Sequence, residues 1–88
     1  MRRVTIDCSA IQSESEFWSQ YLKLIDAESA RFFGRNLNAF RDALLGGGPG
    51  WPRECELAFV NVQQLPPLFL EGLEDIARRS TSVKVTLA

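Results

Sequence analysis

Three short segments of the chain alternate between apolar and polar residues, namely 2–6, 55–60 and 82–87. In the first segment, Val4 and Ile6 share one side while Arg3 and Thr5 share the other. A period of two residues is typical of a strand that buries one face. We therefore predict three strands, each with one face turned toward a hydrophobic core.

Helical spacing appears in the segments between these strands. Ser13 is followed three residues later by Glu16, a capping box that predicts the start of a helix running to about Asp26. Pro67 suits the first turn of a last helix, because a residue there needs no backbone N–H partner. The residues between the second strand and this helix, 61–66, are predicted to form a turn.

The central helix is predicted between a capping Asn36 and a left-handed glycine at Gly46 or Gly47. Its apolar residues recur at helical spacing and predict a buried stripe: Leu37, Phe40 and Leu44. Asn38 and Asp42 are four residues apart and share a face turned away from that stripe. Ala39 and Ala43 are expected on the far side, where their small size would let another surface approach the backbone.

The resulting order of elements is β-α-α-β-α-β, within one domain over residues 1–88. Strands separated by helices imply right-handed crossovers and a parallel sheet. Because all three strands alternate, we expect only one face of the sheet to be covered. The predicted fold is a two-layer α/β domain, a three-stranded parallel sheet with helices packed on one face.

Composition argues against several classes of function. The chain has 88 residues, a formal net charge of −1 and no histidine. The small negative charge disfavours a nucleic-acid binder, and the absence of histidine removes the commonest acid–base group and metal ligand. We therefore expect no enzyme activity, no cofactor and no metal site.

The cysteines and the apolar segments bear on location. Cys8 and Cys55 are expected at opposite ends of two paired strands, too far apart for the Cα separation of about 7 Å that a disulfide tolerates. We see neither a membrane-spanning run nor a signal peptide. The chain is accordingly expected to be cytoplasmic, with two free structural thiols and no membrane partner.

One stretch carries a more specific signal. Residues 33–44 read Phe-Gly-Arg-Asn-Leu-Asn-Ala-Phe-Arg-Asp-Ala-Leu, which resembles the run that opens the second helix in the barstar family of intracellular ribonuclease inhibitors. The order of the surrounding elements is similar over nearly the whole chain. The resemblance implies a barstar-like fold and a 1:1 complex with a small secreted microbial guanyl-type ribonuclease, the free protein being monomeric.

By that resemblance, Asp42 matches the carboxylate that replaces the scissile phosphate in the active site of the enzyme. Asn38 stands where the family usually has a second Asp, and Arg41 where it often has an aromatic residue. Both departures indicate that the charge of this helix face differs from the family pattern. Without the resemblance, Asp42 would read as an ordinary exposed acid pairing with Arg41 or Arg35.

The remaining candidates flank the central helix. Of Phe32 and Phe33, one is expected at the interface and the other in the core. Gly34 is expected to supply a backbone conformation that other residues resist, and Trp51 is either an interface aromatic or a lid over the core edge. The predicted partner-binding set comprises Phe32, Gly34, Asn36, Asn38, Arg41, Asp42, Trp51 and Asp75.

These residues predict an inhibitor that blocks a barnase-like ribonuclease. One alternative is a module with the same fold that recognises a different, non-ribonuclease protein, which Asn38 and Arg41 favour. Another is an RNA-binding domain that uses a basic and aromatic patch, Arg31, Phe32, Phe33 and Arg35. The net charge speaks against the RNA-binding alternative.

Overall fold

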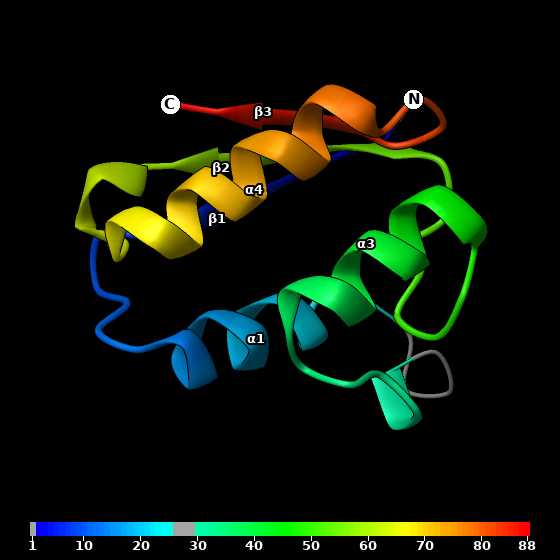
Figure 1. Cartoon of the computed structure of the whole chain (residues 1–88), viewed down its shortest axis with the longest axis horizontal. Helices are drawn as coiled ribbons and strands as arrows, with labels where there is room; N and C mark the ends of the chain where they lie inside the picture. The colour runs from blue at the N-terminus through cyan, green and yellow to red at the C-terminus, as the bar shows by residue number, and fades with distance from the viewer. Residues whose placement is uncertain (1, 26–29) are drawn as a thin grey trace.

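Three strands form one parallel sheet in a computed structural model that describes residues 2–25 and 30–88 (Figure 1). The strands are β1 (Arg2–Asp7), β2 (Cys55–Val60) and β3 (Lys84–Leu87), in the order β1-β2-β3. The predicted parallel sheet is confirmed. The third strand begins at Lys84 rather than Ser82, although Val83 just before it is fully buried.

The pairing register places the apolar residues of neighbouring strands side by side. Leu57 pairs with Val4 and Val85, and Phe59 pairs with Ile6 and Leu87. Alternation is incomplete in β2, because the outward-facing Ala58 is only 2% exposed. It lies between Thr5 and Thr86 in the sheet, whose longer side chains flank this short one.

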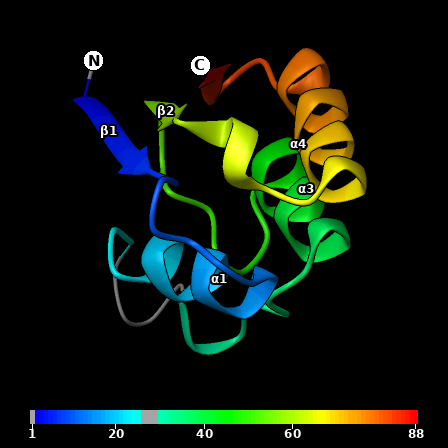
Figure 2. The same ribbon diagram turned by 90° about the vertical axis from the view of Figure 1, so that its left-hand side faces the viewer.

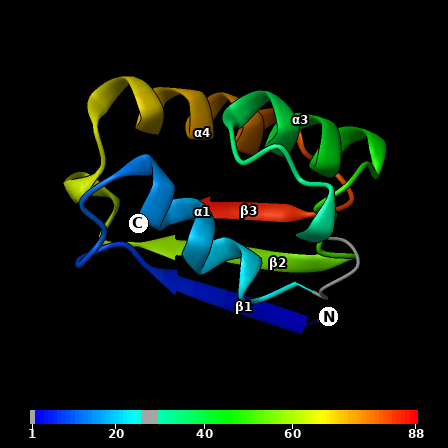
Figure 3. The ribbon, with the colours of Figure 1, turned by 90° about the horizontal axis from the view of Figure 1, so that it is seen from below.

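The helices with bounds inside the described residues are α1 (Glu14–Leu22), α3 (Leu37–Gly46) and α4 (Pro67–Arg79), with a short 3-10 turn η1 (Val62–Gln64). These α-helices lie on the same face of the sheet (Figures 2 and 3). This arrangement confirms the predicted two-layer α/β fold with the order β-α-α-β-α-β. It leaves the outer face of the sheet uncovered by any described helix.

Helix α1 starts as predicted but ends early. The Ser13 hydroxyl accepts the backbone N–H of Glu16 at 3.2 Å. The helix ends at Leu22, so the expected extension is wrong for residues 23–25. Asp26 lies outside the described residues. The N–H of Leu24 bonds to the carbonyl of Tyr21, three residues back, which tightens the last turn and ends the helix.

An aromatic cluster joins the helices to the sheet. Phe17 packs against Trp18 and Phe69 with ring centroids 4.9 Å apart in both pairs, and lies 5.3 Å from Phe59 of β2. Tyr21 donates its hydroxyl to the carbonyl of Gly50 at 2.7 Å. Burial raises the pKa of Tyr21 above its ordinary value. The core therefore fixes the loop at Gly50 relative to α1.

Both cysteines are buried and free, as predicted. Cys55 pairs with Arg2 at the start of β1, while Cys8 follows the end of that strand. The thiols therefore belong to opposite ends of the β1–β2 pair. No helix in the part of the chain that the structure describes is long and apolar enough to cross a membrane.

Candidate functional site

Helix α3 is capped at both ends by its own sequence. Asn36 accepts the N–H of Ala39 at 2.8 Å through its side-chain oxygen and donates its amide to the carbonyl of Gly34 at 3.2 Å. At the other end, Gly47 adopts a left-handed conformation with φ 68° and donates its N–H to Ala43. Both predicted caps are confirmed. The side chain of Asn36 is thus already used to hold the start of the helix.

The two sides of α3 differ sharply in exposure. Phe40 and Leu44 are buried as predicted, and Leu37 is half-buried. The expectation that Ala43 lies on the side open to a partner is wrong, because Ala43 is 0% exposed. It lies three residues after Phe40, on the core side of the helix, where its small side chain lets α3 approach the rest of the core closely.

We use the name α3 face for the exposed side of this helix, formed by Asn38, Arg41, Asp42 and Leu45. Asn38 and Asp42 share this face, as their spacing predicts. Sequence reasoning did not single out Leu45, which is 44% exposed. The available signal was its position three residues after Asp42, on the same side of the helix.

The carboxylate of Asp42 has no charged or hydrogen-bonding partner among the described residues. Among the residues that the structure describes, no ion pair or side-chain hydrogen bond involves Asp42 or Arg41. The reading of Asp42 as an acid paired with Arg41 or Arg35 therefore finds no support in the geometry. Its backbone carbonyl is occupied, since Gly48 donates its N–H to it at 3.4 Å.

The adjacent phenylalanines have separate environments. Phe33 is 7% exposed and packs against Trp18 and Tyr21, with centroids 5.4 and 5.8 Å away. Phe32 is 71% exposed, with the Arg31 guanidinium 5.5 Å from its ring centroid. Phe33 is thus the core residue of the pair, and Phe32 is available to a partner.

The role predicted for Gly34 is wrong. Its φ is not in the left-handed region, which is occupied instead by Arg35 with φ 56°. A Cβ on Gly34 would lie 3.1 Å from the Cβ of Ala39, so close packing is what favours glycine here. Arg35 reaches across to α1 and donates to the Ser19 hydroxyl at 2.8 Å.

Helix α4 runs beside α3 (Figures 1 and 3). The two meet where the Leu37 side chain covers Gly72, so closely that a Cβ on Gly72 would lie 2.5 Å from it. Asp75 comes one turn later on α4 and forms ion pairs with Arg79 at 3.1 Å and Arg78 at 3.4 Å. The charge of Asp75 is therefore neutralised within its own helix.

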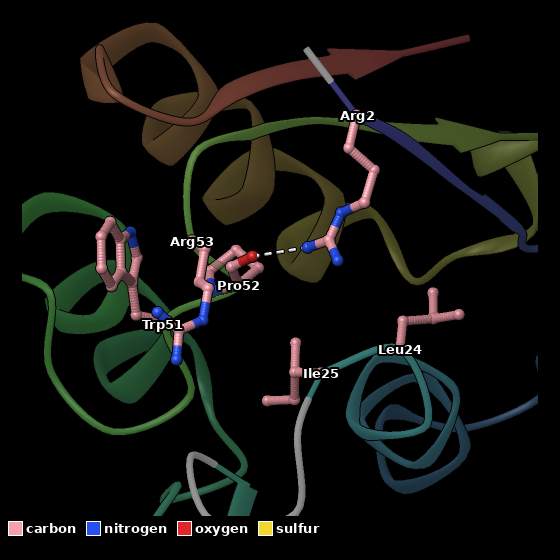
Figure 4. A pocket seen from close by; sticks show the side chains of 6 residues that line it. All are labelled: Arg2, Leu24, Ile25, Trp51, Pro52 and Arg53. Atoms are coloured by element: carbon pink, nitrogen blue, oxygen red, sulfur yellow. Dashed lines mark hydrogen bonds between the residues drawn. The ribbon is translucent and has the colours of Figure 1, made fainter.

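Trp51 lies at a small cleft beside the sheet (Figure 4). The cleft has a volume of about 100 Å³ and is lined by Arg2, Leu24, Ile25, Trp51, Pro52 and Arg53. Arg2 donates to the carbonyl of Pro52 at 2.8 Å. Trp51 is half-buried against the core and is the one candidate residue that lines this cleft. The cleft and the α3 face are therefore distinct features.

No cluster of three potential metal-ligating residues occurs within residues 2–25 and 30–88. The α3 face carries the carboxylate of Asp42, an amide, a guanidinium and an exposed leucine. Phe32 lies on the loop that leads into the helix. Of these side chains, arginine and phenylalanine belong to the types that are enriched at protein interfaces.

The family of the chain follows from comparison with known proteins. The family model described as Barstar (barnase inhibitor) matches residues 1–84 of the 88. A search of curated proteins gave no match. The matched range spans every strand and helix from β1 to α4 and reaches the first residue of β3. The chain therefore belongs to the barstar family.

Proposed function

We propose that this protein inhibits a barnase-like, guanyl-type ribonuclease by covering its active site with the α3 face. Membership of a family of barnase inhibitors supports this proposal. The observation that carries it is the carboxylate of Asp42, exposed on α3 and without an ion pair to any described residue. A free carboxylate at this position is able to replace a substrate phosphate.

The energetics depend on what Asp42 meets in the enzyme. An active site that binds a phosphate offers arginine and histidine donors, and hydrogen bonds between ionised groups are about twice as strong as neutral ones. In the free protein, Asp42 forms no ion pair with a described residue. Binding of the enzyme therefore breaks no such ion pair of Asp42. The carboxylate loses only its water, and the donors of the enzyme compensate for that loss.

The surrounding residues contribute contact area. Phe32 is 71% exposed and supplies an aromatic ring at the edge of the α3 face, while Asn38 supplies an uncharged acceptor. Trp51 extends the contact on the loop after the helix. In this proposal the protein performs no reaction, forms a 1:1 complex and acts in the cytoplasm, where it would protect the producing cell from its own enzyme.

A ribonuclease titration tests the proposal. The protein is added to a panel of barnase-type guanyl ribonucleases, alongside Asp42→Ala and a control, Glu74→Ala. Glu74 is also exposed, but helical spacing turns it away from the stripe of α4 that contacts α3. We expect stoichiometric inhibition that Asp42→Ala weakens by about 2–5 kcal/mol and Glu74→Ala leaves unchanged.

The outcomes separate the function from its site. Inhibition that survives Asp42→Ala would keep the function and exclude Asp42 as its centre. No inhibition across the panel would favour the second candidate, a module with this fold that recognises a protein other than a ribonuclease. Asn38 and Arg41 on the α3 face are the residues that favour that candidate, because they depart from the family pattern.

A further inference from the structure

An uncharged stretch of the chain follows Asp42 directly. Residues 43–52 read Ala-Leu-Leu-Gly-Gly-Gly-Pro-Gly-Trp-Pro, without an ionisable side chain. Four residues of this stretch are exposed, and we name them the apolar shelf: Leu45, Gly46, Gly47 and Pro49. Exposed apolar residues that lie together mark interaction sites, whereas single ones scattered over a surface do not.

The apolar shelf lies next to Asp42. Leu45 and Gly46 follow Asp42 by three and four residues, so they are its neighbours on the surface of α3. Figure 1 shows the loop after α3 passing beside the last turn of the helix. Within this loop, Gly48 donates its N–H to the carbonyl of Asp42 at 3.4 Å, and a Cβ built on Gly48 would lie 3.6 Å from the same oxygen. The carboxylate of Asp42 and the shelf are therefore parts of one surface.

The loop that carries the end of the shelf is fixed from the side of the core. Trp51 donates its N–H to the carbonyl of Gly48 at 3.1 Å, and Tyr21 of α1 donates its hydroxyl to Gly50 at 2.7 Å. Because these bonds already order the loop, a partner that binds the shelf loses little affinity to the entropy of ordering it.

Leu45 is the side chain of the shelf that offers the largest apolar contact. Among the described residues, the large apolar side chains that remain exposed are Leu24, Phe32, Leu45 and Leu68. Of these, Leu45 is the one on α3, where it is 44% exposed. Next to it, a Cβ built on Gly46 would have nothing within 4 Å. A partner can therefore contact the leucine and approach the helix backbone beside it.

Charge on this side of the molecule is limited. Asp42 is the one acid of the α3 face, since Asn38 carries an amide. Asp75 on α4 already forms ion pairs with Arg79 at 3.1 Å and Arg78 at 3.4 Å. Contacts to the apolar shelf would add affinity beside Asp42 without a further charge.

We propose, building on the proposed function, that the apolar shelf binds an uncharged, apolar surface of the ribonuclease beside the cationic pocket that receives Asp42. Leu45 is then the residue that discriminates among ribonucleases. Proteins that bind single-stranded RNA combine cationic groups for the phosphates with apolar surfaces for the bases, so such a surface beside the pocket suits an enzyme that cuts RNA. A ribonuclease with a charged side chain there would bury it unpaired against Leu45 and would be inhibited weakly.

A second copy of the chain fits the shelf less well than an enzyme does. A two-fold axis through the shelf would bring the Asp42 carboxylates of the two copies near one another. Like charges repel, and no basic residue lies in the last turn of α3 to compensate for them. The cationic pocket of a ribonuclease would attract the same carboxylate.

Inhibition constants for the parent protein and two leucine variants test the proposal. The panel of barnase-type ribonucleases is titrated with Leu45→Ala and with a matched control, Leu24→Ala. Leu24 is 39% exposed and lines the cleft beside the sheet, away from the α3 face. Because Leu45 is only partly exposed, its loss should weaken inhibition of the best-inhibited enzyme by about 3- to 10-fold. Leu24→Ala should leave inhibition unchanged, and thermal unfolding checks that both variants are folded.

Gly46→Gln tests the same contact by adding bulk. Nothing lies within 4 Å of the new Cβ, and glutamine is a better helix former than glycine, so the unfolding temperature should not fall. The added side chain would stand on the shelf next to Asp42 and should weaken inhibition by about 10-fold or more. Inhibition at the level of the parent protein by both Leu45→Ala and Gly46→Gln would overturn the proposal.

Ionic strength distinguishes an apolar contact from an electrostatic one. The loss of inhibition caused by Leu45→Ala should be the same at low and at high salt, because salt screens charges and not apolar contacts. A loss that disappears at high salt would contradict an apolar contact at Leu45.

The outcomes separate the proposed function from the inference about the shelf. If the parent protein inhibits no enzyme of the panel, the proposed function fails and the inference fails with it. If it inhibits and the shelf variants inhibit equally well, the function stands and the inference is wrong. Self-association of the parent protein in analytical ultracentrifugation that Leu45→Ala abolishes would assign the shelf to a second copy and would also overturn the inference.

Discussion

At the scale of residues, Asn36 before α3 and Asp42 in the middle of α3 use their polar side chains differently. Asn36 uses its oxygen and its amide in bonds to Ala39 and Gly34, whereas Asp42 has no side-chain bond to a described residue. Both were predicted to bind a partner from one motif. The structure shows that the first stabilises the helix, while partner binding by either stays a prediction.

Replacing Asn36 tests its role as a cap. Asn36→Ala removes the acceptor of the Ala39 N–H and should lower the free energy of unfolding by about 1 kcal/mol. Asn36→Asp keeps an acceptor at that position and should retain most of the stability. Urea unfolding of both variants measures the difference. Equal stability of Asn36→Ala and the parent protein would exclude the capping role.

Cys8 provides a second test at this scale. Burial raises the pKa of its thiol from 9.0 to about 11, and the nearby charge of Asp7 adds to the shift. Since the thiolate is the nucleophile, native Cys8 should react with iodoacetamide at pH 8 far more slowly than in urea. Mass spectrometry of alkylated peptides measures both rates, and rapid native alkylation would contradict the prediction.

At the scale of elements, the loop after α3 is held in place from two sides. Tyr21 of α1 donates to the Gly50 carbonyl, and the Phe33 ring covers the Gly50 Cα. Gly50 has φ 94°, and a Cβ built on it would lie 2.3 Å from a ring carbon of Phe33. This glycine therefore ties α1, the loop before α3 and the loop after it together.

A pair of alanine substitutions tests the importance of this contact. Gly50→Ala combines an unfavourable φ with a clash and should cost about 2 kcal/mol or more. Gly46→Ala is the control, because nothing lies within 4 Å of its added Cβ and alanine favours the helix by about 0.5–1 kcal/mol. Thermal unfolding should shift in opposite directions, and a shift in the same direction would refute the argument.

At the scale of the whole molecule, the groups with shifted pKa values titrate either at acid or at alkaline pH, away from neutrality. The amide of Asn61 donates to Asp7 and, with the N–H of Ser9, lowers the pKa of that carboxyl below its ordinary value of 3.8. Burial raises the pKa values of Cys8 and Tyr21. With no histidine in the chain, no side chain has an ordinary pKa near neutrality.

Stability should therefore be flat between about pH 6 and 8 and fall on both sides. Below pH 3.8, the unfolded Asp7 binds a proton before the folded one does, so stability is lost as pH falls. Above pH 9.0, the unfolded Cys8 releases its proton while the folded thiol keeps it up to about pH 11, so stability is lost as pH rises.

Urea unfolding across this range measures the profile. Asn61→Gly removes the amide that bonds to Asp7 and still permits the left-handed φ of 58° at this position. This substitution should reduce the fall in the free energy of unfolding at acid pH and leave the fall at alkaline pH unchanged. A decline centred near neutral pH in the parent protein would contradict the assignment of these groups.

Much of the fold followed from the sequence because the signals are local. The capping of α1 by Ser13 and of α3 by Asn36 depends on residues within one turn, and the apolar period of each strand depends on its own residues. The bounds of β2, Cys55–Val60, agree with prediction for this reason. The resemblance of residues 33–44 to the barstar family is likewise a property of contiguous residues.

Only the tertiary structure decided what depends on residues far apart in the chain. It assigned Phe33 to the core and left Phe32 exposed, because Trp18 and Tyr21 of α1 cover one ring of the two. It placed Ala43 against the core and gave Gly34 a packing role beside Ala39. In the same way, periodicity tells which residues of α3 share a side, but the elements packed around the helix decide which side remains for a partner.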